Sequence, residues 1–219
     1  QNIVNIALKL NIKKLAYVSS IATLGIYNQG ELIDEETHFV ASKISSNYAL
    51  SKYYAEQEVW RGYAEGLDVV IVNPSVILGP GEWSKGSSQI FQKIYNGLPF
   101  YSTGSTGYVD VNDVAIILVK LLFSKFNNQR YILNAENLTY RDCFNRIADR
   151  LNKPRAKFKV NNFLKSLAWR FEAVRYFISG KRPLITKETA NTKRKPKILL
   201  FKFIIISNDI FIKNFIKWI

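Results

Sequence analysis

The chain has 219 residues, which is enough for one domain with a substantial core or for one domain plus a small cap, and its 47% hydrophobic and 22% charged residues are typical of a soluble globular protein. Its single cysteine, Cys143, excludes an internal disulfide, and no apolar run reaches the roughly 18–20 residues that span a membrane. The net charge of +14 includes seven Lys or Arg against one Asp in residues 190–219 and otherwise shows no clear basic face, so we expect no nucleic-acid partner.

The two ends of the chain are unusual. The chain begins at Gln1 and contains no methionine, so we expect a fragment that lacks its N-terminal part. Residues 190–219 are rich in Lys, Ile and Phe, and we treat them as a basic tail that is native or the product of a frameshift. The composition predicts a cytoplasmic protein without a transmembrane segment.

The first part of the chain alternates helical and strand patterns. Apolar spacing predicts helices at residues 2–11 and 48–65. Short apolar runs predict buried strands at residues 14–19 and from Leu67 onward, the second ended by Asn73-Pro74 and by Gly79-Pro80-Gly81. Such alternation indicates a parallel α/β sheet, whose ligands bind at the carboxyl ends of the strands.

Several residues mark the ends of these elements. Ser45, Ser46 or Asn47 is expected to cap the helix at 48–65, and Gly66 to end it. Later in the chain we expect a helix at 90–97. A further helix is expected to begin at Asp113 with Asn112 or Asp113 as its cap, and Asp110 and Asp113 are expected to be structural. After residue 131 we expect a strand, a turn and a helix capped by Thr139, and then a helix at 158–180.

Tyr48 and Lys52 lie four residues apart on a predicted helix, so both side chains project from one face. A tyrosine phenol is a poor acid–base group at neutral pH, but a neighbouring ammonium stabilises the phenolate. The pair can then exchange a proton with a substrate oxygen, while a hydroxyl such as that of Ser20 holds the oxygen in place. Ser19 and Thr23 are alternatives to Ser20, and an exposed helical pair without a role is the alternative for Tyr48 and Lys52.

Four segments in order carry a family resemblance: "YVSSIATLG", "YALSKYYAE", "VVIVNPSVILGPG" and "GYVDVNDVA". Together they resemble the extended short-chain dehydrogenase/reductase family, the NAD-dependent epimerase/dehydratase group, over about residues 1–189. The resemblance implies a Rossmann-like doubly wound parallel sheet whose first half is missing, with a smaller C-terminal substrate subdomain. It divides the chain into residues 1–81 for the dinucleotide-binding half, 82–189 for a substrate subdomain that returns to the sheet, and 190–219 for the tail.

The resemblance also implies the chemistry. The catalytic residues of the family fall on Ser20, Tyr48 and Lys52, and the cofactor is NAD or NADP. The residues expected to line the cofactor are Tyr48, Lys52, Asn73, Pro74, Ser75 and Val76. The substrate is a small molecule, and the intact parent is compatible with a homodimer. We expect Cys143 to be a core thiol and His38 to hold no metal ion.

Two departures from the family limit this interpretation. The chain has no G-x-G-x-x-G or G-x-x-G-x-x-G motif, so we expect the fragment to bind dinucleotide weakly and to be inactive. Thr106-Gly107-Tyr108 stands where sugar-nucleotide epimerases often carry an Arg-Asp pair, and this favours the branch that resembles dihydroflavonol reductases and 3β-hydroxysteroid dehydrogenases. A nucleotide-sugar 4-epimerase or dehydratase, a non-catalytic binding protein of the same fold and a pseudogene product remain alternatives.

Overall fold

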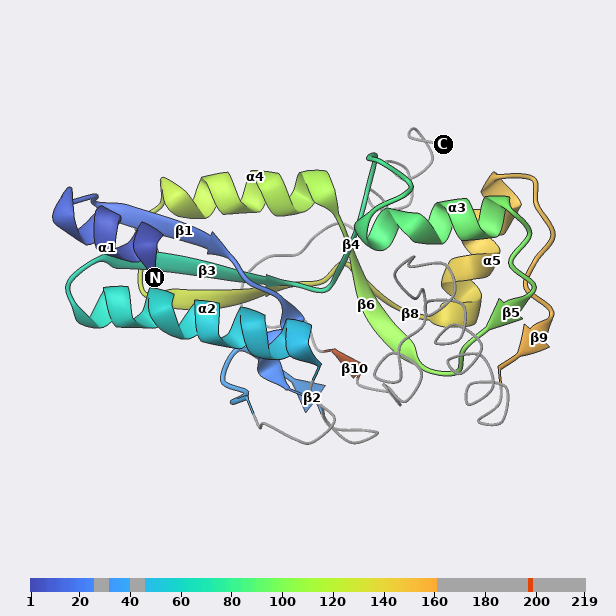
Figure 1. Ribbon diagram of the computed structural model, residues 1–219, viewed down its shortest axis with the longest axis horizontal. Coiled ribbons are helices and arrows are strands. Elements are labelled where there is room, and N and C mark those ends of the chain that lie inside the picture. The colour runs from blue at the N-terminus through green and yellow to red at the C-terminus, as the bar shows by residue number, and fades with distance from the viewer. Residues whose placement is uncertain (26–31, 40–45, 161–196, 199–219) are drawn as a thin grey trace, which may run out of the picture.

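The structure, a computed structural model, describes residues 1–25, 32–39, 46–160 and 197–198. At its centre lies a three-stranded sheet in the order β1-β3-β7 (Figure 1). These strands are formed by Lys14–Val18, Asp68–Pro74 and Gln129–Leu133, and both pairings are parallel. The predicted parallel α/β sheet is therefore confirmed.

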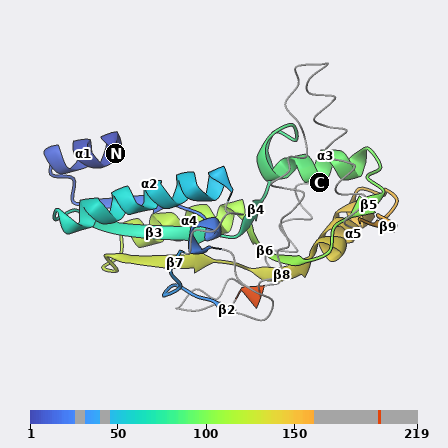
Figure 2. The same ribbon diagram turned by 60° about the horizontal axis from the view of Figure 1, so that its bottom comes forward.

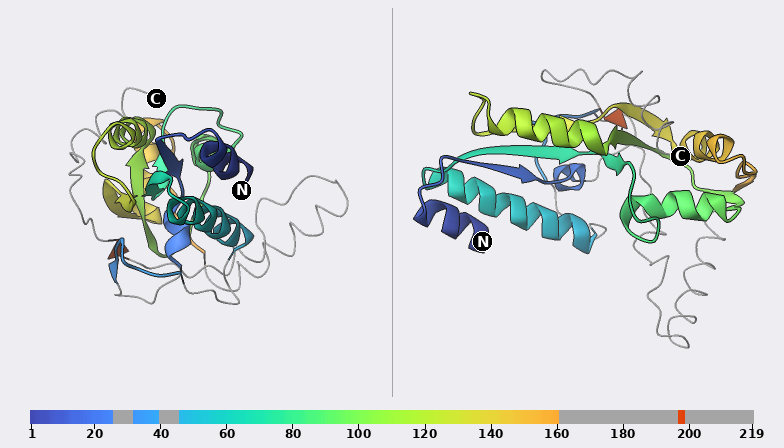
Figure 3. Two further views of the ribbon diagram at one scale, coloured as in Figure 1. Left: turned by 90° about the vertical axis from the view of Figure 1, so that its left-hand side faces the viewer. Right: turned by 90° about the horizontal axis from the view of Figure 1, so that it is seen from above.

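Helices cover both faces of this sheet, as the end-on view in Figure 3 shows. Helix α4 (Val111–Leu122) packs on one face, and α1 (Asn2–Lys9) and α2 (Asn47–Ala64) pack on the other. Along β3, Val70 and Val72 join the cluster under α4, whereas Val69 and Ile71 join the cluster under α1 and α2. A strand buried on both faces needs an unbroken apolar run, and "VVIV" supplies it.

A second lobe extends beyond the carboxyl ends of these strands (Figures 1 and 2). Its sheet has the order β4-β6-β8, formed by Val76–Leu78, Ser105–Asp110 and Glu136–Thr139, with β8 antiparallel to β6. Helices α3 (Gln89–Tyr95) and α5 (Tyr140–Arg150) pack together beside it. The remaining short elements are η1 (Ile21–Leu24), β2 (Leu32–Ile33), η2 (Gly86–Ser88), β5 (Phe100–Tyr101), β9 (Phe158–Lys159) and β10 (Lys197–Ile198).

Most predicted ends of the helices are confirmed. The Ser46 hydroxyl caps α2 by accepting a hydrogen bond from Ala49 N at 3.1 Å, and Gly66 follows the helix with a φ of +99°. Thr139 caps α5 through Asp142 N at 3.0 Å. The predicted cap of α4 is wrong, because the Asp110 carboxylate accepts from Asn112 N at 2.7 Å and the helix begins at the next residue.

Three other predictions are corrected. The single buried strand predicted from Leu67 is two strands, because β3 ends at Pro74, within the predicted Asn73-Pro74 pair, and Val76–Leu78 form β4 in the second sheet. The segment after β7 is more than a turn, since Glu136–Thr139 form β8 against β6. Phe158 and Lys159 form strand β9 against β5, and the rest of the helix predicted at 158–180 lies outside the described residues from 161 onward.

Beyond these elements, the tail at 190–219 lies outside the described residues, apart from the β10 backbone beside β2. The boundary at residue 81 stays a prediction. Strand β7, which follows it, belongs to the first sheet, and α4 packs on that sheet. In the part of the chain that the structure describes, no helix has the length and apolar character needed to cross a membrane.

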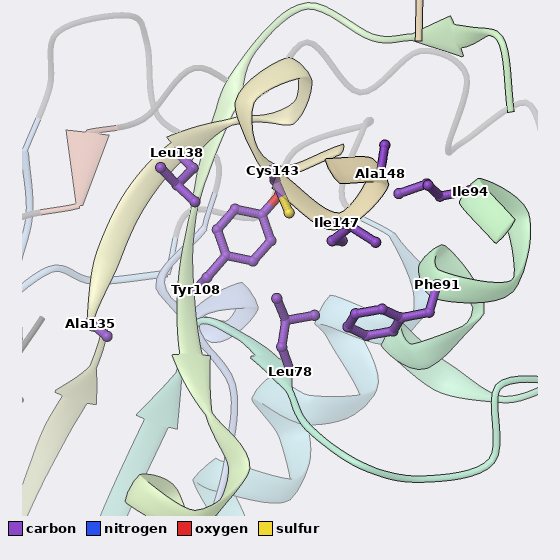
Figure 4. Close-up of a cluster of buried hydrophobic side chains, with 9 residues drawn as sticks. All are labelled: Leu78, Phe91, Ile94, Tyr108, Ala135, Leu138, Cys143, Ile147 and Ala148. Atoms are coloured by element: carbon purple, nitrogen blue, oxygen red, sulfur yellow. The ribbon is translucent and has the colours of Figure 1, made fainter. Parts of the chain in front are cut away.

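Cys143 lies in the core of the second lobe, between Tyr108 and Ile147 (Figure 4). It is buried, as the sequence predicts, and burial raises the pKa of its thiol to about 11. The thiolate is the reactive form, and its fraction falls tenfold for each unit by which the pKa rises.

We therefore expect iodoacetamide at pH 8 to alkylate the folded chain at least about 100-fold more slowly than an exposed thiol of ordinary pKa. Mass spectrometry of timed samples measures the rate, and the chain unfolded in urea, which is expected to react at the ordinary rate, is the control. Equal rates for the folded and unfolded chains would contradict the burial of Cys143.

Candidate active site

Ser20 lies directly after β1, where the chain turns into η1. Its hydroxyl oxygen caps η1 by accepting a hydrogen bond from Ala22 N at 3.2 Å. Among the described residues no side chain or carbonyl takes the hydroxyl hydrogen, and Ser20 is only half-buried. The group is therefore held by its oxygen and is able to donate to a ligand.

The two alternatives to Ser20 are placed differently. Ser19 and Thr23 are 4% and 1% exposed, and both hydroxyls contact the carboxylate of Glu56. The Ser19 hydroxyl donates to Glu56 Oε2 at 2.5 Å, and the Thr23 hydroxyl lies 2.8 Å from the same oxygen. Of these three hydroxyls, that of Ser20 alone is both accessible and uncommitted as a donor in the described structure.

Tyr48 and Lys52 lie in the first two turns of α2, four residues apart as predicted. The Tyr48 side chain is 60% exposed, whereas Lys52 reaches inward. Lys52 Nζ donates to the carbonyl of Val18 at 2.8 Å and lies 5.1 Å from the centre of the Tyr17 ring. This bond fastens the helix to the end of β1, two residues before Ser20.

The charges around Lys52 act on one another. Burial lowers the pKa of Lys52, and the carboxylate of Glu56 opposes that shift. Burial also raises the pKa of Tyr17, with the charges of Glu56 and Tyr48 adding to it. These interactions place Tyr17, Tyr48, Lys52 and Glu56 in one electrostatic neighbourhood at the end of β1.

Asn73 at the end of β3 is completely buried and faces the loop that carries Ser20. Its Nδ2 donates to Thr23 Oγ1 and to Glu56 Oε2, both at 2.9 Å, and lies 3.3 Å from the Ser20 carbonyl. The structure thus brings Asn73 to the Ser20 loop. The following residues, Pro74 to Val76, cross from β3 into β4, and Ser75 N donates to the Leu133 carbonyl of β7 at 2.9 Å.

Unpaired polar atoms gather where β3 and β7 end. Asn73 Oδ1, Ser75 Oγ and both polar side-chain atoms of Asn134 are buried without a hydrogen-bond partner among the described residues. Leaving such an atom unpaired costs about 1–3 kcal/mol, which a bound polar group can offset. Amide and hydroxyl groups of this kind suit the carboxamide of a nicotinamide, so the residues here fit that group.

Sequence reasoning did not identify Glu56, Arg130 or Asn134 as parts of this site. Glu56 follows Lys52 by four residues and so shares the face of Tyr48 and Lys52, a signal that was available in the sequence. Arg130 and Asn134 come from β7, and no local pattern marks them. In the described ranges, no group of three or more His, Cys, Asp or Glu side chains is arranged to hold a metal ion.

This arrangement of strand ends and helix has a counterpart in a known family. The model of the NAD dependent epimerase/dehydratase family matches residues 1–134, which is more than half of the chain. The chain belongs to this family. The predicted resemblance to extended short-chain dehydrogenases/reductases is thereby confirmed, and NAD or NADP is the cofactor expected of a family defined by its NAD dependence.

Relatives in the epimerase/dehydratase family include reductases by name. A Synechocystis sp. protein provisionally named dihydroflavonol 4-reductase is 30% identical over 181 residues, which are 80% of this chain and 53% of the relative. Cinnamoyl-CoA reductase 1 of Petunia hybrida is 26% identical over 151 residues, covering 64% and 45%. The chain spans about half the length of the curated relatives it matches.

Solved structures show the same fold. A nucleoside-diphosphate-sugar epimerase from Pseudomonas aeruginosa superposes with a TM-score of 0.73 at 21% identity, over 98% of this chain and 69% of that one. A UDP-glucose 4-epimerase from Thermus thermophilus in complex with NAD gives 0.60 at 18%, covering 98% and 67%. These likenesses confirm the predicted Rossmann-like α/β fold, present here in part.

Proposed function

We propose that the protein catalyses NAD(P)-dependent oxidation or reduction at a hydroxyl or carbonyl of a small molecule, with Ser20, Tyr48 and Lys52 as catalytic residues. One observation carries this proposal. The Ser20 hydroxyl, which donates to no group in the described part of the chain, follows the strand end to which Lys52 binds, and Tyr48 projects from the same helix face one turn away.

Each side chain has a defined task in this proposal. The Tyr48 hydroxyl gives a proton to the substrate oxygen, or takes one from it, as the direction of the reaction requires. The Ser20 hydroxyl donates a hydrogen bond to the same oxygen and orients it. The Lys52 ammonium, anchored on the Val18 carbonyl, places a positive charge one helical turn from Tyr48.

A nicotinamide, when bound, would deliver the hydride for the reduction or accept it in the oxidation. Besides Tyr48 and Lys52, the residues that would hold it are Asn73, Pro74, Ser75 and Val76, which follow one another at the carboxyl end of β3. The unpaired Asn73 Oδ1 and Ser75 Oγ support this placement, because a carboxamide offers both a donor and an acceptor.

Among the activities of the family we favour a reductase of the dihydroflavonol-reductase or 3β-hydroxysteroid-dehydrogenase type. The names of the two relatives above support this choice, as does the Thr106-Gly107-Tyr108 segment that replaces an Arg-Asp pair. A nucleotide-sugar 4-epimerase or dehydratase is the second candidate, favoured by the fold likeness to sugar-nucleotide epimerases.

Net consumption of NADPH or NADH distinguishes these candidates. In the longest form of the protein that its gene encodes, we expect aromatic or steroid carbonyl compounds to oxidise the reduced cofactor in stoichiometric amount. An epimerase acting on a UDP-sugar would convert the sugar with no net change in cofactor absorbance at 340 nm. Sugar conversion without net oxidation would contradict the reductase assignment, and absence of both activities would contradict the catalytic proposal.

The 219-residue chain itself is expected to bind nicotinamide dinucleotide weakly and to be inactive, because it contains no Gly-rich loop to hold the pyrophosphate at a helix N-terminus. Isothermal titration of NAD and NADP into the folded chain measures this affinity. We expect no saturation in the micromolar range. A micromolar dissociation constant would show that the remaining residues suffice for binding.

A further inference from the structure

The carboxylate of Glu56 lies inside the protein, with only 1% of the residue exposed. Buried carboxylates are rare unless hydrogen bonds and opposite charge compensate them. Glu56 Oε2 lies 2.5 Å from the Ser19 hydroxyl and 2.9 Å from Asn73 Nδ2, which both donate to it. The Thr23 hydroxyl lies 2.8 Å from Glu56 Oε2 and 2.8 Å from the Ser20 carbonyl, so its one hydrogen is shared between these two acceptors. Glu56 Oε1 faces Arg130 Nη1 at 3.4 Å.

These bonds converge on the loop that carries Ser20. Lys52 holds Val18 on one side of Ser20, and Glu56 holds Ser19 and Thr23 on both sides of it. Both contacts come from the same face of α2, because Lys52 and Glu56 are four residues apart. The spacing continues the series that starts at Tyr48, so Tyr48, Lys52 and Glu56 lie on one face of the helix.

Arg130 compensates the charge of Glu56 from β7 while being anchored elsewhere. Its Nε donates to the Glu35 carbonyl at 2.6 Å and its Nη2 to the Thr37 carbonyl at 2.7 Å. The guanidinium is therefore fixed mainly by backbone, and its 3.4 Å contact with Glu56 is long for a charge-assisted hydrogen bond. Much of the carboxylate's hydrogen bonding is thus directed to the Ser20 loop and to Asn73.

We propose that Glu56 is a positioning residue of the site, which fixes the Ser20 loop against the Tyr48 and Lys52 face of α2 and supports the positive charge of Lys52. A contribution of Glu56 to catalysis rests on the proposed function. Its effects on the order of the Ser20 loop and on the charge of Lys52 are measurable without turnover. A residue that only filled space in the core would have neither effect.

The charge effect has a defined direction. Burial lowers the pKa of Lys52 and Glu56 raises it, so removing the carboxylate lets the pKa of Lys52 fall further. Among the described residues, the groups beside Lys52 are the Tyr17 ring on β1, the Val18 carbonyl and the Glu56 carboxylate on α2, and Tyr48 lies one turn away on the same helix face. Only Glu56 among them offers a buried carboxylate, and a glutamine there keeps the shape without the charge.

The test compares Glu56→Gln with Glu58→Gln in the 219-residue chain. Glu58 lies on the same helix and pairs with Arg61 at the surface, so its change is the matched control. NMR of the lysine side chains follows the Lys52 titration, and amide exchange reports the loop through Ala22 N, which Ser20 caps. For Glu56→Gln we expect a lower Lys52 titration midpoint and exchange at Ala22 about tenfold faster or more. Glu58→Gln is expected to change neither.

A further variant separates loop and charge and serves if Glu56→Gln does not fold. Ser19→Ala removes one donor to Glu56 and leaves its charge, so we expect faster exchange at Ala22 with an unchanged Lys52 titration. Unchanged exchange in Ser19→Ala, or an unmoved Lys52 titration in a folded Glu56→Gln chain, would overturn the proposal. If both readouts change as expected while Tyr48→Phe keeps full turnover in the longer form, the positioning role stands and the proposed function fails.

Discussion

Replacing Tyr48 with Phe is expected to lower kcat by about 10²–10⁴-fold, the usual contribution of a positioned acid–base group. The substitution removes only the hydroxyl, and the Tyr48 side chain is largely exposed, so the fold has little reason to change. The affinity for NAD(P) is expected to stay within about twofold, because a lost acid–base group affects the transition state more than cofactor binding. The assay uses the longest encoded form, with cofactor oxidation followed at 340 nm.

Tyr54→Phe provides the matched control for this result. Tyr54 lies on the same helix, is 64% exposed, and packs its ring edge against Tyr53, away from the residues of the candidate site. We expect it to leave kcat and KM unchanged. A Tyr48→Phe enzyme that retains most of the wild-type kcat would exclude Tyr48 as the proton-transferring residue and would favour a binding protein on the same fold.

Replacing Asn73 with Leu is expected to lower the free energy of unfolding by about 2–3 kcal/mol, with or without cofactor present. Leucine has a similar size, so the loss comes from hydrogen bonds and not from a cavity. Glu56 and Thr23 each lose the donor that Asn73 Nδ2 supplies, and the deprived carboxylate stays buried. Urea unfolding followed by circular dichroism measures the difference.

Ser75→Ala, two residues further along the chain, is the comparison variant for the stability of Asn73→Leu. Its hydroxyl has no partner in the described part of the chain, so removing it is expected to leave the stability unchanged or slightly higher. If Ser75 lines the cofactor, the same change raises the KM for NAD(P) in the longer form.

Equal stability of the Asn73→Leu and wild-type chains would contradict a structural role for Asn73 in the network around Glu56.

The pair of variants shows where sequence reasoning reached its limit. The family resemblance implies the same task for Asn73 and Ser75, which is to line the cofactor. The structure points Asn73 Nδ2 into the Glu56 network and leaves the Ser75 hydroxyl unpaired. Which contacts a side chain at a strand end makes depends on what packs above it, and a linear motif carries no information about that.

The local features were open to prediction because their causes are local. Helix α2 with its Ser46 cap, the strand run of β3 and the spacing of Tyr48 and Lys52 follow from periodicity and capping chemistry within a few residues. The order of four such segments also sufficed to indicate the family. Errors arose where two local signals competed, as at the cap of α4, where Asp110 acts in place of Asn112 or Asp113.

The sequence by itself thus determined the alternation of strands and helices, the family, and the presence of a tyrosine and a lysine on one helix face. Only the tertiary structure decided which of Ser19, Ser20 and Thr23 has an available hydroxyl, and that Glu56 lies buried beneath the loop they form. The physical reason is separation along the chain. The carboxylate of Glu56 meets Asn73 from 17 residues away and Arg130 from 74, and such contacts exist only once the sheet has assembled.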